Sequence, residues 1–139
     1  LPASLFRQAT LILLGLGLLG AAVLFFGAPL LMRLFAGQGY EQGIPALTAL
    51  GAAVPFLFVN FVLGSGVFAL GKEWWGFIGL CLSLLLNIVG NYWVMTQYPS
   101  HALVGAALFT AGSEAVLTCS HVTILALAKP TSESPQSSH

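Results

Sequence analysis

The sequence predicts an all-α membrane protein that crosses a bilayer four times. Of its 139 residues, 58% are hydrophobic and only 6% are charged, whereas soluble domains carry about 25% charged residues. The apolar residues fall into four runs, and each run exceeds the roughly 20 helical residues that a bilayer core requires. Every lysine and arginine lies outside the centres of these runs, so the fold class is a polytopic helical membrane protein.

The first two membrane helices are expected over residues 10–32 and 44–70. The first is too long for a signal peptide, and we expect it to end near Pro29–Met32, because a glycine-rich loop follows. The second begins at Ile44-Pro45, where a missing N–H costs little. Pro55 interrupts this second helix near its centre, which makes it a hinge candidate.

The third and fourth helices are expected over residues 75–95 and 102–128. The segment 1–129 therefore forms one four-helix transmembrane unit. The tail, residues 130–139, is rich in serine and proline and cannot bury apolar surface, so we expect it to be disordered.

The basic residues indicate an orientation. Arg7, Lys72 and Lys129 fall on one side if all four helices span, and Arg33 falls on the other. Cytoplasmic loops carry the excess of lysine and arginine. We therefore expect both termini and the loop between the second and third helices to lie in the cytoplasm.

Glu114 lies near the middle of the fourth helix, where a charged side chain costs at least about 2.5–3.5 kcal/mol. No lysine or arginine of this chain reaches that depth. The carboxyl group is then a neutral acid bonded to a neighbouring helix, or it faces water, or its partner lies outside this chain. A role in handling protons or substrate is the alternative to a purely structural one.

Small and weakly polar residues recur every four positions on the fourth helix, including Thr110, Glu114 and Thr118. Such a face lets helices approach closely, so we expect it to point inward. The bulkier residues of this helix are expected to face lipid: Leu103, Val104, Leu108, Val116 and Leu117.

Three asparagines, Asn60, Asn87 and Asn91, also lie within apolar runs. An amide in lipid is costly unless it is paired, so each is expected either to hydrogen-bond between helices or to line a polar cavity. His121 is about 10 Å along the helix from Glu114, too far for direct pairing, and is expected to be packed or to reach toward the interface.

Several function classes are excluded. The net charge is zero, so there is no basic face for nucleic acid. Cys81 and Cys119 lie in apolar runs without metal-ligand spacing. No nucleophile with a partner and no phosphate-binding loop is evident. We therefore expect no enzyme activity, no metal and no cofactor.

The order of several motifs resembles the C-terminal part of the polysaccharide biosynthesis flippases, which include the O-antigen flippases. They belong to the multidrug/oligosaccharidyl-lipid/polysaccharide exporter superfamily. The motifs are Phe35 to Leu47 in the outer loop, Pro55-Phe56 with Asn60, Ala69-Leu70-Gly71-Lys72, Asn87 with Asn91, Tyr98, and Val104 to Thr110 followed by Ser113-Glu114.

The resemblance implies a transporter of two bundles, each of about six or seven helices. Such a transporter moves a lipid-linked oligosaccharide of the cell envelope, such as a lipopolysaccharide precursor, across the cytoplasmic membrane by alternating access. Its implied partners are membrane lipid, the lipid-linked oligosaccharide and the remaining helices of the same transporter. The chain opens on Leu1 without a methionine, so we expect a fragment from the second bundle. The cationic residues that grip the substrate would lie in the first bundle, so no substrate-binding residue is transferred.

Two alternatives remain open. One is a cation-coupled multidrug exporter of the same superfamily, in which Glu114 would be the proton site. The other is a small membrane subunit without transport activity.

Overall fold

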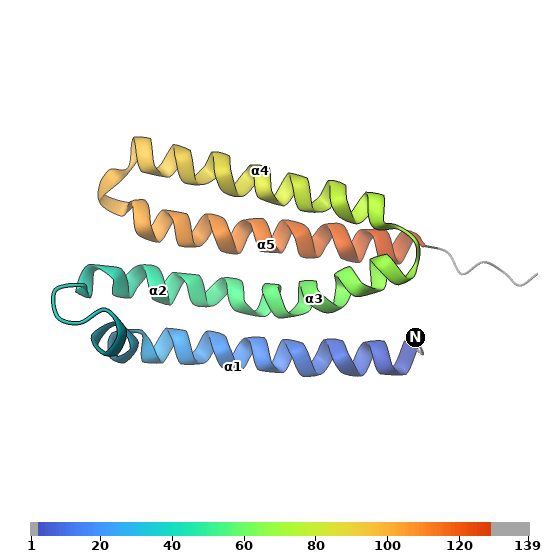
Figure 1. Cartoon of the computed structure of the whole chain (residues 1–139), viewed down its shortest axis with the longest axis horizontal. Helices are drawn as coiled ribbons and strands as arrows, with labels where there is room; N and C mark the ends of the chain where they lie inside the picture. The colour runs from blue at the N-terminus through green and yellow to red at the C-terminus, as the bar shows by residue number, and fades with distance from the viewer. Residues whose placement is uncertain (1–2, 129–139) are drawn as a thin grey trace, which may run out of the picture.

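The computed structural model describes residues 3–128 and confirms the predicted fold class (Figure 1). This part of the chain is almost entirely helical, apart from its short connections, and contains no strand. Four helical segments are long and apolar enough to cross a membrane. These segments are Ser4–Phe35, Glu41–Ala69, Glu73–Gln97 and Pro99–Leu127.

The long helices are joined or extended by short 3-10 turns. The α-helices are α1 (Ala3–Phe35), α2 (Ile44–Leu50), α3 (Val54–Ala69), α4 (Glu73–Gln97) and α5 (Ala102–Leu127). The 3-10 turns are η1 (Glu41–Gly43), η2 (Gly51–Ala53) and η3 (Pro99–His101).

The first helix is longer at both ends than the sequence predicts. It begins at Ala3 and continues through Pro29 to Phe35. A proline inside a membrane helix removes one backbone bond without ending the helix, because neighbouring groups compensate for it. The helix ends just before Gly37 and Gly39, whose φ angles of 84° and 98° are left-handed. Glycine adopts that conformation without a steric penalty.

The second membrane segment is divided at its middle. Helix α2 ends at Leu50, η2 covers Gly51–Ala53, and α3 begins with Val54 and Pro55. Pro55 has no N–H to donate to the carbonyl four residues earlier, and the local backbone tightens into a 3-10 turn instead. Such mid-helix turns often mark hinges; a hinge role for Pro55 stays a prediction.

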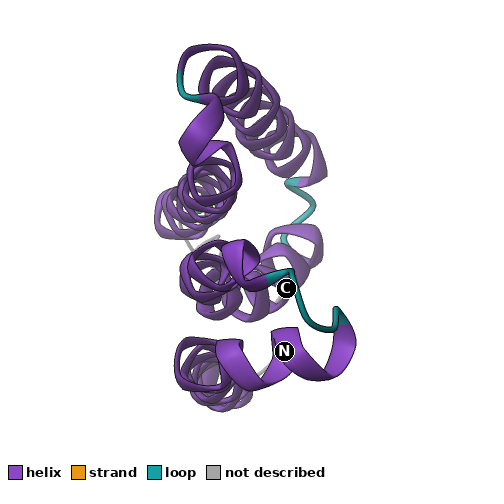
Figure 2. Cartoon of the chain, turned by 90° about the vertical axis from the view of Figure 1, so that its left-hand side faces the viewer, coloured by secondary structure: helices purple, strands orange, loops and turns teal. Residues whose placement is uncertain are grey.

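The helices pack as an open row, in the order α1, α2–α3, α5 and α4 (Figures 1 and 2). Helix α5 therefore has a neighbour on either side, whereas α1 and α4 lie at the two edges. The row encloses a small core of mostly small side chains, such as Ala28, Ala53 and Val67. Large apolar side chains stay uncovered along every long helix, as expected for surfaces that contact lipid or further helices.

Glycines allow the closest approaches in this row. A Cβ atom built on Gly17 of α1 would lie only 2.7 Å from the Cα atom of Pro55 in α3. A Cβ on Gly79 of α4 would lie 2.9 Å from the Cβ of Ser120 in α5. Small residues at helix contacts are typical of membrane proteins.

The ends of the helices divide into two groups. The start of α1, the connection from α3 to α4 and the end of α5 lie at one end of the row (Figure 1). The connections from α1 to α2 and from α4 to α5 lie at the other. This alternation agrees with four membrane crossings. The side that faces the cytoplasm stays a prediction, and the predicted tail at 130–139 lies outside the described residues.

One prediction about the inward face of α5 was wrong. Leu117, expected to face lipid, is buried with 7% of its surface exposed. The reason is that α5 packs against helices on two sides, α3 and α4. Its buried surface is therefore wider than a single stripe of small residues.

Candidate functional site

Asn60 of α3 joins Glu114 and Thr118 of α5 in what we call the α3–α5 cluster. The Asn60 amide nitrogen donates to the Glu114 carboxyl oxygen at 2.8 Å and lies 3.0 Å from the Glu114 backbone carbonyl. The Thr118 hydroxyl lies 2.9 Å from both the Asn60 amide oxygen and the Glu114 carbonyl oxygen. Both ends of the buried Asn60 amide are thus satisfied by α5.

A second group, the α4–α5 cluster, lies on the other side of α5. The Asn87 amide nitrogen donates to the hydroxyls of Thr110 and Ser113, each at 3.2 Å. The Ser83 hydroxyl donates to the Ser113 backbone carbonyl at 2.7 Å. Asn91 donates to the Asn87 amide oxygen at 3.0 Å. The cluster therefore extends along α4 through positions spaced by four residues.

Ser113 and Glu114 are consecutive on α5, so the two clusters meet at one turn of that helix. Each predicted polar candidate belongs to one of them: Glu114, Asn60 and Thr118 to the first, and Asn87, Asn91 and Thr110 to the second. For the asparagines the structure shows interhelical bonding or, at Asn91, a bond within α4. A role in transport stays a prediction for all of these residues.

Ser83 was not among the predicted polar candidates, although its spacing on the helix was a signal. Ser83, Asn87 and Asn91 recur every four residues and so share one face of α4. Ser83 and Ser113 are among the few buried polar side chains of the described chain, with 5% and 3% of their surfaces exposed. Serine is compatible with both buried and exposed positions, which is why burial was needed to recognise it.

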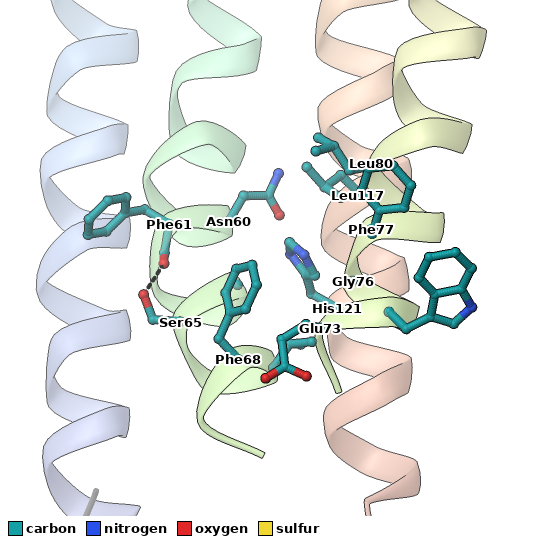
Figure 3. A pocket seen from close by; sticks show the side chains of 13 residues that line it. Asn60, Phe61, Ser65, Phe68, Glu73, Gly76, Phe77, Leu80, Leu117 and His121 are labelled. Atoms are coloured by element: carbon teal, nitrogen blue, oxygen red, sulfur yellow. Dashed lines mark hydrogen bonds between the residues drawn. The ribbon is translucent and has the colours of Figure 1, made fainter. Parts of the chain in front are cut away.

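The α3–α5 cluster borders a cavity of about 550 Å³ that opens between α3 and α4 (Figure 3). Asn60 and His121 both line it, and Glu73 lies nearer its outer end. His121 is buried, and its Nδ1 atom has no hydrogen-bond partner in the described structure. His121 is therefore packed, as expected, but it also faces a cavity that the sequence did not predict.

The chemistry available at these clusters is hydrogen bonding plus one carboxyl group. Within residues 3–128, no group of three histidine, cysteine, aspartate or glutamate side chains could hold a metal ion. Amides and hydroxyls at the middle of membrane-length helices can bind polar groups that would otherwise be unsatisfied in hydrocarbon.

Four helices long and apolar enough to span a bilayer define the class of a polytopic helical membrane protein. The MatE family model matches residues 2–93. The chain therefore belongs to the MatE family of membrane transporters, within the multidrug/oligosaccharidyl-lipid/polysaccharide exporter superfamily. No match was found among curated proteins or among solved structures.

Proposed function

We propose that this chain contributes four membrane helices to a flippase that moves lipid-linked oligosaccharide across the cytoplasmic membrane. Membership of the MatE family supports transport. The order of motifs from Phe35 to Glu114, which resembles the polysaccharide flippases, supports the substrate class. The observation that carries the proposal is the pair of polar clusters that meet at Ser113 and Glu114 in the middle of α5.

The mechanism that fits this geometry is a change of packing around α5. Few contacts join α3 directly to α4, so α4 is tied to the row chiefly through α5, whereas α3 packs against both α1 and α5. The 3-10 turn at Gly51–Ala53 gives the α2–α3 segment a point at which its backbone is already non-α-helical. Rocking of α3 against α5 would break and remake the bonds of Asn60, exposing its amide to polar cargo.

Reconstitution tests this function. The transporter that contains this chain is placed in vesicles with a fluorescent lipid-linked oligosaccharide, and a membrane-impermeant quencher reports the fraction of probe in the outer leaflet. We expect transbilayer movement that is lost in Asn60→Leu and retained in Ser120→Ala, because Ser120 bonds only to the backbone of its own helix. Movement no faster than in protein-free vesicles would refute the proposal.

A second candidate function, cation-coupled export of drugs, is favoured by one observation. Glu114 places a carboxyl group inside the membrane-spanning part of α5, and Asn60 donates to its Oε2 atom at 2.8 Å. A carboxyl group can take up and release a proton, whereas the amides and hydroxyls around it cannot at ordinary pH.

The variant Glu114→Gln separates the two candidates. Glutamine keeps an oxygen that can accept the hydrogen bond from Asn60, so the helix pairing is retained while the proton site is lost. Drug-dependent proton flux that disappears in Glu114→Gln would favour drug export. Oligosaccharide movement that persists in the same variant would favour the flippase.

A further inference from the structure

Helix α3 covers a row of polar side chains on α5, which we call the α5 strip: Glu114, Thr118 and His121. These positions are spaced by four and three residues, so they share one face of the helix. Asn60 of α3 bonds to the first two of them. One turn later, Gly64 lies against the third, because a Cβ built there would be 3.5 Å from the His121 Cε1 atom. The same face of α3 therefore closes over the whole strip.

A single residue holds this cover in place by hydrogen bonds. Within residues 3–128, every hydrogen bond between α3 and α5 runs through the Asn60 amide, which bonds to Glu114 and Thr118. At Gly64 the approach to His121 is an ordinary van der Waals contact. The His121 Nδ1 atom is buried without a hydrogen-bond partner in the described structure. The cover is thus latched at Asn60 and only packed at His121.

The two ends of α3 are held differently. Near its start, α3 meets the backbone of α1 closely, because a Cβ built on Gly17 would lie 2.7 Å from the Pro55 Cα atom. Nearer its end, a Cβ on Gly66 would lie 2.8 Å from the ring of Phe6, a side chain of α1 that can rotate aside. The cavity of about 550 Å³ also flanks only the later part of α3, since its lining residues there begin at Asn60 (Figure 3). The start of α3 is therefore pinned, and its later part has room to move.

The backbone on either side of α3 provides joints. Before it, η2 at Gly51–Ala53 is already a 3-10 turn, and Pro55 lacks the N–H that would continue the α-helical bonding. After it, Gly71 has a left-handed φ of 64°, and α4 begins at Glu73. Residues at the ends of elements are the usual hinges of moving segments, so α3 can tilt while its own helical hydrogen bonds stay intact.

From these observations we propose that α3 is a gate over the α5 strip. It pivots near Pro55, it is latched by Asn60, and its opening exposes Glu114, Thr118 and His121 together. Opening also brings water to the unpaired His121 Nδ1 atom, which offsets part of the loss of the Asn60 bonds. The inference deepens the proposed function and rests on it in one respect, because it identifies the groups that a change of packing around α5 presents to cargo.

The accessibility of a cysteine at position 121 measures the gate. His121→Cys is introduced together with Cys119→Ser into the intact transporter that contains this chain, and the protein is reconstituted in vesicles without substrate. A water-soluble methanethiosulfonate is added, and mass spectrometry of the peptide that contains residue 121 gives the rate of modification. Cysteines elsewhere in the transporter fall in other peptides and do not interfere. A thiol buried in apolar surroundings reacts slowly, so the rate reports how often the strip is open.

Removal of the latch should open the gate. We expect slow modification of residue 121 in the parent protein and modification at least about ten-fold faster in Asn60→Leu, which loses every hydrogen bond between α3 and α5. Thr118→Val removes one of these bonds and keeps the shape of the side chain, so it should give a smaller acceleration. It also serves as the test if Asn60→Leu fails to fold. Adding Pro55→Ala, which restores an N–H at the pivot, should reverse part of the acceleration.

Two controls separate gate opening from a general loosening of α5. Asn87→Leu is the same substitution in the α4–α5 cluster, where Asn87 bonds to α5 from α4, and it should leave the rate at residue 121 unchanged. Ala107→Cys, tested in place of His121→Cys, puts the thiol at another buried position of α5, two turns before Glu114. Its modification should stay slow in Asn60→Leu.

Four results would overturn the proposal. They are fast modification of residue 121 in the parent protein, an unchanged rate in both Asn60→Leu and Thr118→Val, an equal acceleration in Asn87→Leu, and an equal acceleration at Ala107→Cys. An acceleration that Pro55→Ala leaves unchanged would overturn the pivot. These measurements contain no substrate, so their failure is distinguishable from a failure of the proposed function, which the assay of oligosaccharide movement tests directly.

Discussion

The closest contact between α1 and α3 depends on the missing side chain of Gly17. A Cβ atom at this position would lie 2.7 Å from the Cα of Pro55 and 3.3 Å from the Cβ of Phe58. Carbon atoms pack favourably at about 3.5–4.0 Å, so Gly17→Ala requires the two helices to separate by about 1 Å. Overpacking of this kind costs about 1–3 kcal/mol.

Gly15 is the matched control for this substitution. It lies in the same helix, and a Cβ there meets nothing within 4 Å. Alanine is more favourable than glycine in a helix by up to about 1 kcal/mol, and this gain is common to both variants. The difference in unfolding free energy between Gly15→Ala and Gly17→Ala therefore isolates the contact. We expect Gly17→Ala to be less stable by about 1–3 kcal/mol.

Unfolding in mixed micelles of increasing denaturing detergent, followed by circular dichroism, measures this difference. Phe58→Ala should not rescue Gly17→Ala, because the nearest atom belongs to the backbone of Pro55 and cannot move aside. Equal stability of the two glycine variants would refute the close packing of α1 on α3.

Three further predictions concern individual contacts. Gly43→Ala should be tolerated in the same unfolding assay. Its Cβ would lie 2.7 Å from Met32, but the nearest atom is the terminal methyl of that side chain, which can move aside. A loss of unfolding free energy as large as that of Gly17→Ala would contradict this prediction. A double-mutant cycle of Asn60→Leu and Thr118→Val should give a coupling of about 0.6 kcal/mol and at most about 1.7 kcal/mol, and no coupling would argue against the α3–α5 cluster. Ser83→Ala should lower the free energy of unfolding by about 0.5–1.5 kcal/mol, because it loses a hydrogen bond to α5. Ser120→Ala loses a hydrogen bond only to its own helix and should lower it little. Equal effects of the two substitutions would refute the interhelical bond.

The sequence by itself determined that the chain has a membrane fold and which polar residues lie within its membrane spans. The membrane spans follow from the length of the apolar runs and from the scarcity of charged residues within them. Both are properties of a linear stretch of chain. Depth in the membrane is also linear, because each helical residue rises 1.5 Å. The candidates from Asn60 to Thr118 could therefore be placed near mid-depth before any contact was known.

Only the tertiary structure decided which side chains meet, because the rotation of each helix about its axis is set by its neighbours. It paired Glu114 with Asn60 of α3, and it directed Asn87 of α4 to Thr110 and Ser113 instead. The open row gave α5 two packed sides, which buried Leu117. The same geometry formed the cavity at His121, since a cavity arises from the spacing of three helices and leaves no pattern in any one of them.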